Sequence, residues 1–111
     1  MFYLEKEITI SAGHHLKLDY ESPCQRFHGH NFKVIIYCRG SKLNAEGMLV
    51  DFVTIKKEVM KFDHSDLNTL MHNNPTAENL AERLCESIPY CWKVRIEETP
   101  TNICIFQKES E

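Results

Sequence analysis

Three histidines and one cysteine gather in the N-terminal third of the chain. His14 is followed, after a gap, by the run Cys24-Gln25-Arg26-Phe27-His28-Gly29-His30. Successive side chains of a strand point to opposite faces, so His28 and His30 would project from one face with Gly29 between them. Together with His14 from a neighbouring strand end, they would offer three nitrogens to a divalent metal. Zinc accepts such a set readily, and three protein ligands leave a fourth position open for water or substrate. The pattern therefore predicts a catalytic zinc site.

Cys24 lies just before the two closely spaced histidines, and two roles are open for it. As a fourth ligand it would close a Cys-His₃ tetrahedron and give a non-catalytic, zinc-stabilised module. As a thiol that does not bind the metal, it would lie near a cation that favours its thiolate form, which is the setting of a reactive cysteine. Closed zinc sites usually draw on more thiolates in Cys-x₂-Cys pairs, and the sequence has no such pair. We therefore favour the reactive thiol.

Composition favours a small protein of a reducing compartment. The 111 residues are enough for one domain with a modest core, so we expect a single domain over residues 1–111. The formal net charge of −3 argues against nucleic-acid binding, which needs a basic face. No stretch approaches the roughly 20 apolar residues of a membrane span, and the N-terminus lacks the layout of a signal peptide. Five cysteines without a framework spacing favour a cytoplasmic protein over one built on disulfides.

Hydrophobic patterns predict four strands and two helices. Alternating apolar residues indicate a strand over residues 2–10 that runs on towards His14, and a second over residues 28–39. Asp51 is the expected N-cap of a helix that reaches residue 62, and Thr76 that of a helix ending near residue 88. The remaining strands are expected at residues 94–99 and 103–108. The order β-β-α-α-β-β predicts an α+β fold, an antiparallel sheet with two helices on one face.

Several motifs, in order along nearly the whole chain, resemble a family of enzymes. Residues 24–30 resemble the Cys-x-Arg-Leu-His-Gly-His segment of the bacterial 6-carboxytetrahydropterin synthases (QueD type), relatives of the 6-pyruvoyl-tetrahydropterin synthases. Residues 10–16 resemble the family's Phe-x-Ala-Ala-His-Arg-Leu, and residues 62–68 its Leu-Asp-His-x-x-Leu-Asn. Residues 47–52, 74–80 and 96–99 complete the resemblance.

The resemblance implies the tunnelling fold (T-fold), in which subunits join edge to edge. Trimers close a barrel, and two trimers stack as a hexamer. An isolated four-stranded sheet leaves unpaired backbone groups on two edges, and closing a barrel across subunits removes both edges. We therefore expect a homo-oligomer, a trimer or a hexamer.

The resemblance also implies the metal ligands and the base. Zinc would be held by His14, His28 and His30. His15 stands where the family has arginine, which leaves the function of that arginine open. Cys24 matches the family's catalytic cysteine, and a thiolate is a competent general base near neutral pH.

Asp63 and His64 are the expected proton-relay partners of Cys24. Composition alone favours a solvated turn here, because Asp, His, Ser and Asn are common turn residues. The family motif favours the catalytic role instead.

Glu98 is the expected anchor of a pterin, since a carboxylate accepts two hydrogen bonds from the 2-amino group and N3–H. Its neighbour Glu97 should point to the other face of the strand. A surface acidic pair is the alternative for both. Thr76 is expected to contact the pterin while capping its helix. Arg26 is the best candidate for binding triphosphate, with Lys17 a weaker one.

The implied reaction converts 7,8-dihydroneopterin triphosphate to 6-carboxy-5,6,7,8-tetrahydropterin and releases acetaldehyde and triphosphate. Its product feeds 7-deazaguanine (queuosine) biosynthesis. The close alternative is 6-pyruvoyl-tetrahydropterin synthase activity, which stops after triphosphate elimination and tautomerisation. The three-residue gap between Cys24 and His28 favours the first reaction, because the animal pyruvoyl enzymes carry a longer insert there.

Overall fold

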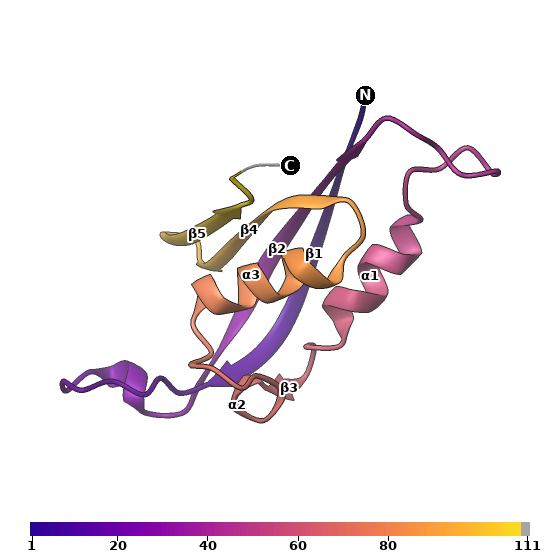
Figure 1. Cartoon of the computed structure of the whole chain (residues 1–111). Helices are drawn as coiled ribbons and strands as arrows, with labels where there is room; N and C mark the ends of the chain where they lie inside the picture. The colour runs from indigo at the N-terminus through magenta and orange to yellow at the C-terminus, as the bar shows by residue number, and fades with distance from the viewer. Residues whose placement is uncertain (110–111) are drawn as a thin grey trace.

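The computed structural model describes residues 1–109, and two long strands dominate its sheet. β1 (Phe2–His14) and β2 (His28–Gly40) pair antiparallel along their full lengths. β4 (Cys91–Thr99) pairs antiparallel with β2, and β5 (Asn102–Gln107) pairs antiparallel with β4. These strands form one curved layer (Figure 1). β2 is therefore a central strand.

A fifth strand departs from the sequence-based expectation. β3 (Ser65–Asp66) pairs parallel with Ala12 and Gly13 at the end of β1. The strand order is β3-β1-β2-β4-β5, so the sheet is mixed and the prediction of a wholly antiparallel four-stranded sheet is wrong. Two residues are too few to show an alternating pattern in the sequence. The α+β class and the order of the longer elements are confirmed.

Both predicted helices form, with the predicted caps. α1 (Phe52–Met60) begins after Asp51, whose side chain accepts the Val53 N–H at 2.8 Å. α3 (Ala77–Ser87) begins after Thr76, whose hydroxyl accepts the Asn79 N–H at 3.1 Å. Such caps contribute about 1 kcal/mol each. Two shorter elements were not predicted, the 3₁₀ turn η1 (Pro23–Gln25) and the one-turn helix α2 (Leu67–Leu70).

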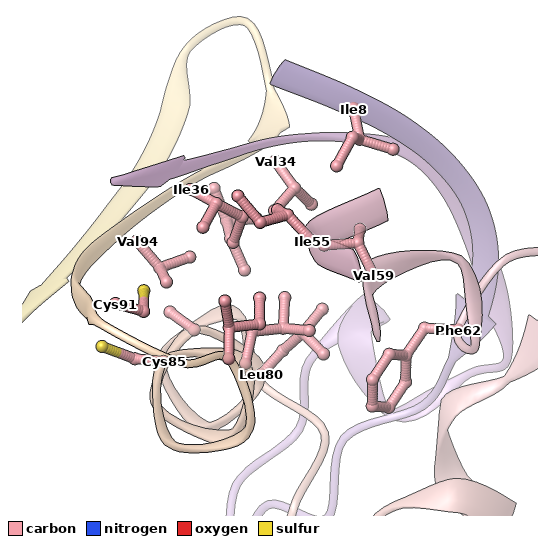
Figure 2. Close-up of a cluster of buried hydrophobic side chains, with 14 of the residues drawn as sticks. Ile8, Val34, Ile36, Ile55, Val59, Phe62, Leu80, Cys85, Cys91 and Val94 are labelled. Carbon is pink, nitrogen blue, oxygen red and sulfur yellow. The ribbon is translucent and has the colours of Figure 1, made fainter. Parts of the chain in front are cut away.

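The core lies between the sheet and the two longer helices, which cover the same face (Figure 1). Figure 2 shows the strand residues Val34 and Ile36 facing Ile55 of α1 and Leu80 of α3, and all four are fully buried. Burying one such aliphatic side chain contributes roughly 1.5–3 kcal/mol. This packing fixes α3, and with it the segment that leads into α3, against the sheet.

Thiols make up part of this core. All five cysteines are free, and Cys85 and Cys91 lie close together in the cluster of Figure 2. Cys38 is also fully buried, whereas Cys24 and Cys104 are partly exposed. Within residues 1–109, no helix combines the length and the apolar character needed to cross a bilayer.

Candidate metal centre and active site

The three histidines meet at the ends of β1 and β2. His14 is directly opposite His28 in the antiparallel register, and His30 lies one pleat further along β2. The ring centroids of His14 lie 4.6 Å from His28 and 5.2 Å from His30, and those of His28 and His30 are 4.8 Å apart. One ligand nitrogen from each ring lies within 4.8 Å of the other two. The register thus builds the three-nitrogen group that the sequence predicts.

Backbone carbonyls orient two of these rings. His14 Nδ1 lies 2.7 Å from the Pro75 carbonyl oxygen, and His28 Nδ1 lies 2.7 Å from that of Arg26. A carbonyl only accepts, so each Nδ1 carries the proton and donates it. Each Nε2 then keeps its lone pair, which is the usual arrangement of a metal-binding histidine.

Two ring nitrogens of the group are buried without a partner. Among the described residues, His14 Nε2 and His30 Nε2 form no hydrogen bond although both atoms are buried. An unsatisfied buried polar group costs about 1–3 kcal/mol, so such atoms call for a ligand. A divalent metal with three imidazole ligands fits this donor set.

Glu98 comes to the same place from β4. Its Oε2 lies 3.4 Å from His14 Nε2 and 3.8 Å from His30 Nε2. Burial lowers the pKa of His30, Glu98 opposes this shift by raising it, and the neighbouring His14 and His28 add to the lowering. The net effect favours the neutral imidazole that a metal requires.

Glu97 lies on the opposite face of β4, as predicted. It forms an ion pair and a short hydrogen bond with Arg95, two residues back along the strand. Only Glu98 of the acidic pair therefore faces the histidines.

Cys24 and Arg26 lie in the loop that joins β1 to β2. Ser22 caps η1, and its hydroxyl accepts the Cys24 N–H at 3.2 Å. Cys24 is partly exposed, and it does not belong to the group of mutually close metal-ligating atoms found among the described residues. Cys24 therefore lies outside the three-histidine group. The Arg26 side chain is exposed, while its carbonyl holds His28.

Asp63 and His64 are tied to the outer edge of β1. Asp63 Oδ1 accepts the Ser11 N–H at 2.8 Å, and the His64 N–H donates to the Ser11 carbonyl at 2.6 Å. The turn places His64 at φ 53°, with its side chain 82% exposed and its Nε2 3.5 Å from Asp63 Oδ2. Across residues 1–109, no hydrogen bond joins either side chain to Cys24. His64 and His30 do line one cavity of about 440 Å³.

Known proteins match this chain over almost its whole length. The family model described as 6-pyruvoyl tetrahydropterin synthase matches residues 3–109. The chain belongs to the 6-pyruvoyl tetrahydropterin synthase family. It is 32% identical to the 6-carboxy-5,6,7,8-tetrahydropterin synthase of Bacillus subtilis (strain 168), over 96% of this chain and 85% of that protein. The enzyme of that name from Rickettsia conorii is 31% identical over 79% of this chain and 80% of its own length.

Solved structures of the 6-pyruvoyl tetrahydropterin synthase family confirm the T-fold. The Caenorhabditis elegans 6-pyruvoyl tetrahydropterin synthase superposes with a TM-score of 0.75 at 28% identity, covering 97% of this chain and 96% of that one. The Plasmodium falciparum 6-pyruvoyl tetrahydropterin synthase reaches a TM-score of 0.64 at 16% identity, over 96% and 98% of the two chains, and supports the fold alone.

His15 and Gly13 are two of the positions at which this chain departs from the family motifs that it resembles. His15, at the arginine position, lies outside the three-histidine group, and its Nε2 is 3.5 Å from Asn68 Nδ2. Gly13 stands where the pattern has alanine. A Cβ on Gly13 would lie 2.4 Å from Phe27 Cζ, so the phenylalanine ring rests directly on the glycine.

Proposed function

We propose that this member of the family is a zinc-dependent 6-carboxy-5,6,7,8-tetrahydropterin synthase, a carbon–carbon lyase acting on 7,8-dihydroneopterin triphosphate. It would release acetaldehyde and triphosphate. The observation that carries the proposal is the pair of buried, unpartnered nitrogens, His14 Nε2 and His30 Nε2, beside the Glu98 carboxylate. Relatives of that name, similar over most of the chain, support the choice of product.

His14, His28 and His30 would hold the zinc through their Nε2 atoms. Zinc bound there would lower the pKa of the substrate's side-chain hydroxyls and polarise the carbonyl that forms. The carbonyls of Pro75 and Arg26 keep the His14 and His28 rings in the required tautomer, because each accepts the Nδ1 proton.

Glu98 would select the pterin. Its carboxylate accepts two hydrogen bonds from the amino-pyrimidinone edge, and Glu97 is held away by Arg95. The Thr76 hydroxyl accepts the Asn79 N–H, which leaves its own proton free to donate to the ligand. The exposed side chains of Arg26 and Lys17 would bind the triphosphate.

Cys24 would remove a proton from the substrate side chain, and His64 with Asp63 would return protons during the elimination. Within the described residues of one chain no hydrogen bond joins the pair to Cys24, while Ser11 holds the pair at the outer edge of β1. A second copy that pairs with β1 along residues 2–10, next to the part that Asp63, His64 and β3 already occupy, would place His64 near a boundary between subunits. This supports a homo-oligomer, a trimer or a hexamer, as the working form.

The deciding experiment supplies 7,8-dihydroneopterin triphosphate to the purified, zinc-loaded protein. Acetaldehyde formed in step with a carboxylated pterin supports the proposal. A pyruvoyl pterin without acetaldehyde would assign the chain to the sibling reaction. No turnover at full zinc occupancy would indicate the non-catalytic, zinc-stabilised module. The five free thiols support a cytoplasmic location. The product of the proposed reaction would feed 7-deazaguanine (queuosine) biosynthesis.

A further inference from the structure

Two asparagine side chains hold the extended segment that follows β1. Asn68 Oδ1 accepts the His15 N–H at 2.8 Å, and Asn68 Nδ2 donates to the His15 carbonyl at 3.0 Å. Asn74 pairs with Lys17 in the same way: its Oδ1 accepts the Lys17 N–H at 2.9 Å, and its Nδ2 donates to the Lys17 carbonyl at 3.1 Å. A carboxamide that pairs with both backbone groups of one residue replaces the neighbour that a sheet would provide. Residues 15–17 therefore continue the course of β1 beyond its last strand pairing.

Leu16 lies between the two clamped residues, His15 and Lys17, and it holds the backbone of Cys24. In an extended chain, successive backbone N–H groups point to opposite sides. The Leu16 N–H accordingly points away from the asparagines and donates to the Cys24 carbonyl at 2.7 Å. The segment is thus fixed by asparagine side chains along one edge and fixes the backbone of Cys24 along the other.

The Asn74 clamp is itself anchored to α3. The Asn74 carbonyl accepts the Thr76 N–H and Asn79 Nδ2, both at 2.8 Å. The next residue, Pro75, uses its carbonyl to hold His14 Nδ1. In Figure 1 this segment, leading into α3, lies beside the end of β1. One short stretch therefore holds both the His14 ring and the backbone that leads to Cys24.

We propose that Asn68 and Asn74 are positioning residues that fix the metal ligand His14 and the thiol Cys24 relative to each other. The inference rests on the proposed function for the roles of His14 as a metal ligand and of Cys24 as the base. Partners that orient metal ligands typically change metal affinity by roughly 10- to 100-fold when they are altered. Loss of either clamp would therefore weaken metal binding and free Cys24.

The test compares Asn68→Asp and Asn74→Asp with a matched control, Asn73→Asp. Each clamp variant keeps the acceptor oxygen but turns a carboxylate oxygen towards a backbone carbonyl, which removes one hydrogen bond and adds repulsion. Asn73 is exposed, so its variant adds the same charge beside Asn74 without touching the clamp. In the full-length chain we expect Co²⁺ affinity to fall about tenfold in the clamp variants, with changed visible absorption bands. We expect the control to match the native protein.

A second measurement follows the thiol. In the metal-free protein, mass spectrometry would report iodoacetamide alkylation at Cys24, and we expect the rate to rise several-fold in the clamp variants, because the partly exposed thiol is released. A merely structural role would lower the melting temperature but leave Co²⁺ affinity, spectrum and alkylation equal to those of Asn73→Asp. That result would overturn the proposal.

If the variants do not fold, hydrogen–deuterium exchange of the native metal-free chain tests whether the clamp is present. Amides of His15, Leu16 and Lys17 should be protected like those of β1, although they lie outside a strand. Exchange at the rate of exposed loop amides would refute the clamp. None of the three measurements needs turnover, so a failure of the proposed reaction would be recognised separately.

Discussion

Replacing Glu98 by glutamine tests the pterin anchor most directly. The carboxylate would accept two hydrogen bonds from donors on the ligand, and bonds to charged groups are worth roughly 1.5–3 kcal/mol each. Glutamine keeps one acceptor and turns a donor towards the ligand's own donor. The Glu98 side chain is 25% exposed, so water would relieve part of this clash. We therefore expect a loss of about 3 kcal/mol, or roughly a hundredfold in affinity.

Glu97→Gln is the matched control. That change breaks the ion pair with Arg95 on the other face of β4, and a partly exposed pair contributes only about 0–1 kcal/mol to stability. Pterin affinity should therefore stay within a factor of about two, on the order of the scatter in such measurements.

The assay is a fluorescence titration of zinc-loaded protein with neopterin, with metal content measured in every sample. We expect both variants to keep zinc, since the Pro75 and Arg26 carbonyls orient His14 and His28 without help from Glu98. Equal, mild effects at both glutamates would refute the anchor. Loss of zinc in Glu98→Gln would instead make Glu98 a metal ligand.

The remaining predictions concern the metal, the base and one cap. His14→Ala should strip the metal and His15→Ala should retain it, by elemental analysis; the opposite result would move the ligand by one residue. Cys24→Ala should keep metal and fold but lower turnover on the order of a hundred- to ten-thousand-fold, and loss of metal would make Cys24 a ligand. Thr76→Ala should lower the free energy of unfolding by about 1 kcal/mol in urea titrations, and no change would mean that the cap adds nothing.

Features that depend on neighbouring residues in the sequence, such as helix caps and strand alternation, were predictable. Asp51 and Thr76 were recognised as caps because the residue type and the following apolar spacing suffice. Strand alternation predicted that His28 and His30 share a face and that Glu97 and Glu98 do not, and the structure confirms both.

Non-local contacts account for what the sequence did not predict. β3 forms because Ser65 and Asp66 pair with the end of β1, and two residues are too few to show an alternating hydrophobic pattern in the sequence. The sequence alone predicts no role for Asn68 and Asn74, since asparagine outside a regular element is expected in a turn. Both lie within motifs shared with the family, which was the available signal. The catalytic and binding roles of all the site residues stay predictions, and this includes the pterin anchor Glu98 and the metal ligands His14, His28 and His30.

The contact between Gly13 and Phe27 makes these two positions a coupled pair. Where the family pattern has alanine and leucine, this chain has glycine and phenylalanine, so volume removed at one position is regained at the other. Phe27 Cζ occupies the space of an alanine Cβ at position 13, whereas Gly29, opposite Gly13, would meet only the Ala12 carbonyl oxygen at 3.6 Å. The coupling has a direction: leucine at 27 is smaller than the ring that Gly13 already accommodates, whereas alanine at 13 requires the exposed Phe27 ring to move aside or to be replaced by a smaller side chain. On a mutational route from this chain to the family pattern, leucine at 27 would therefore precede alanine at 13, with His14 as the immediate neighbour of the exchange.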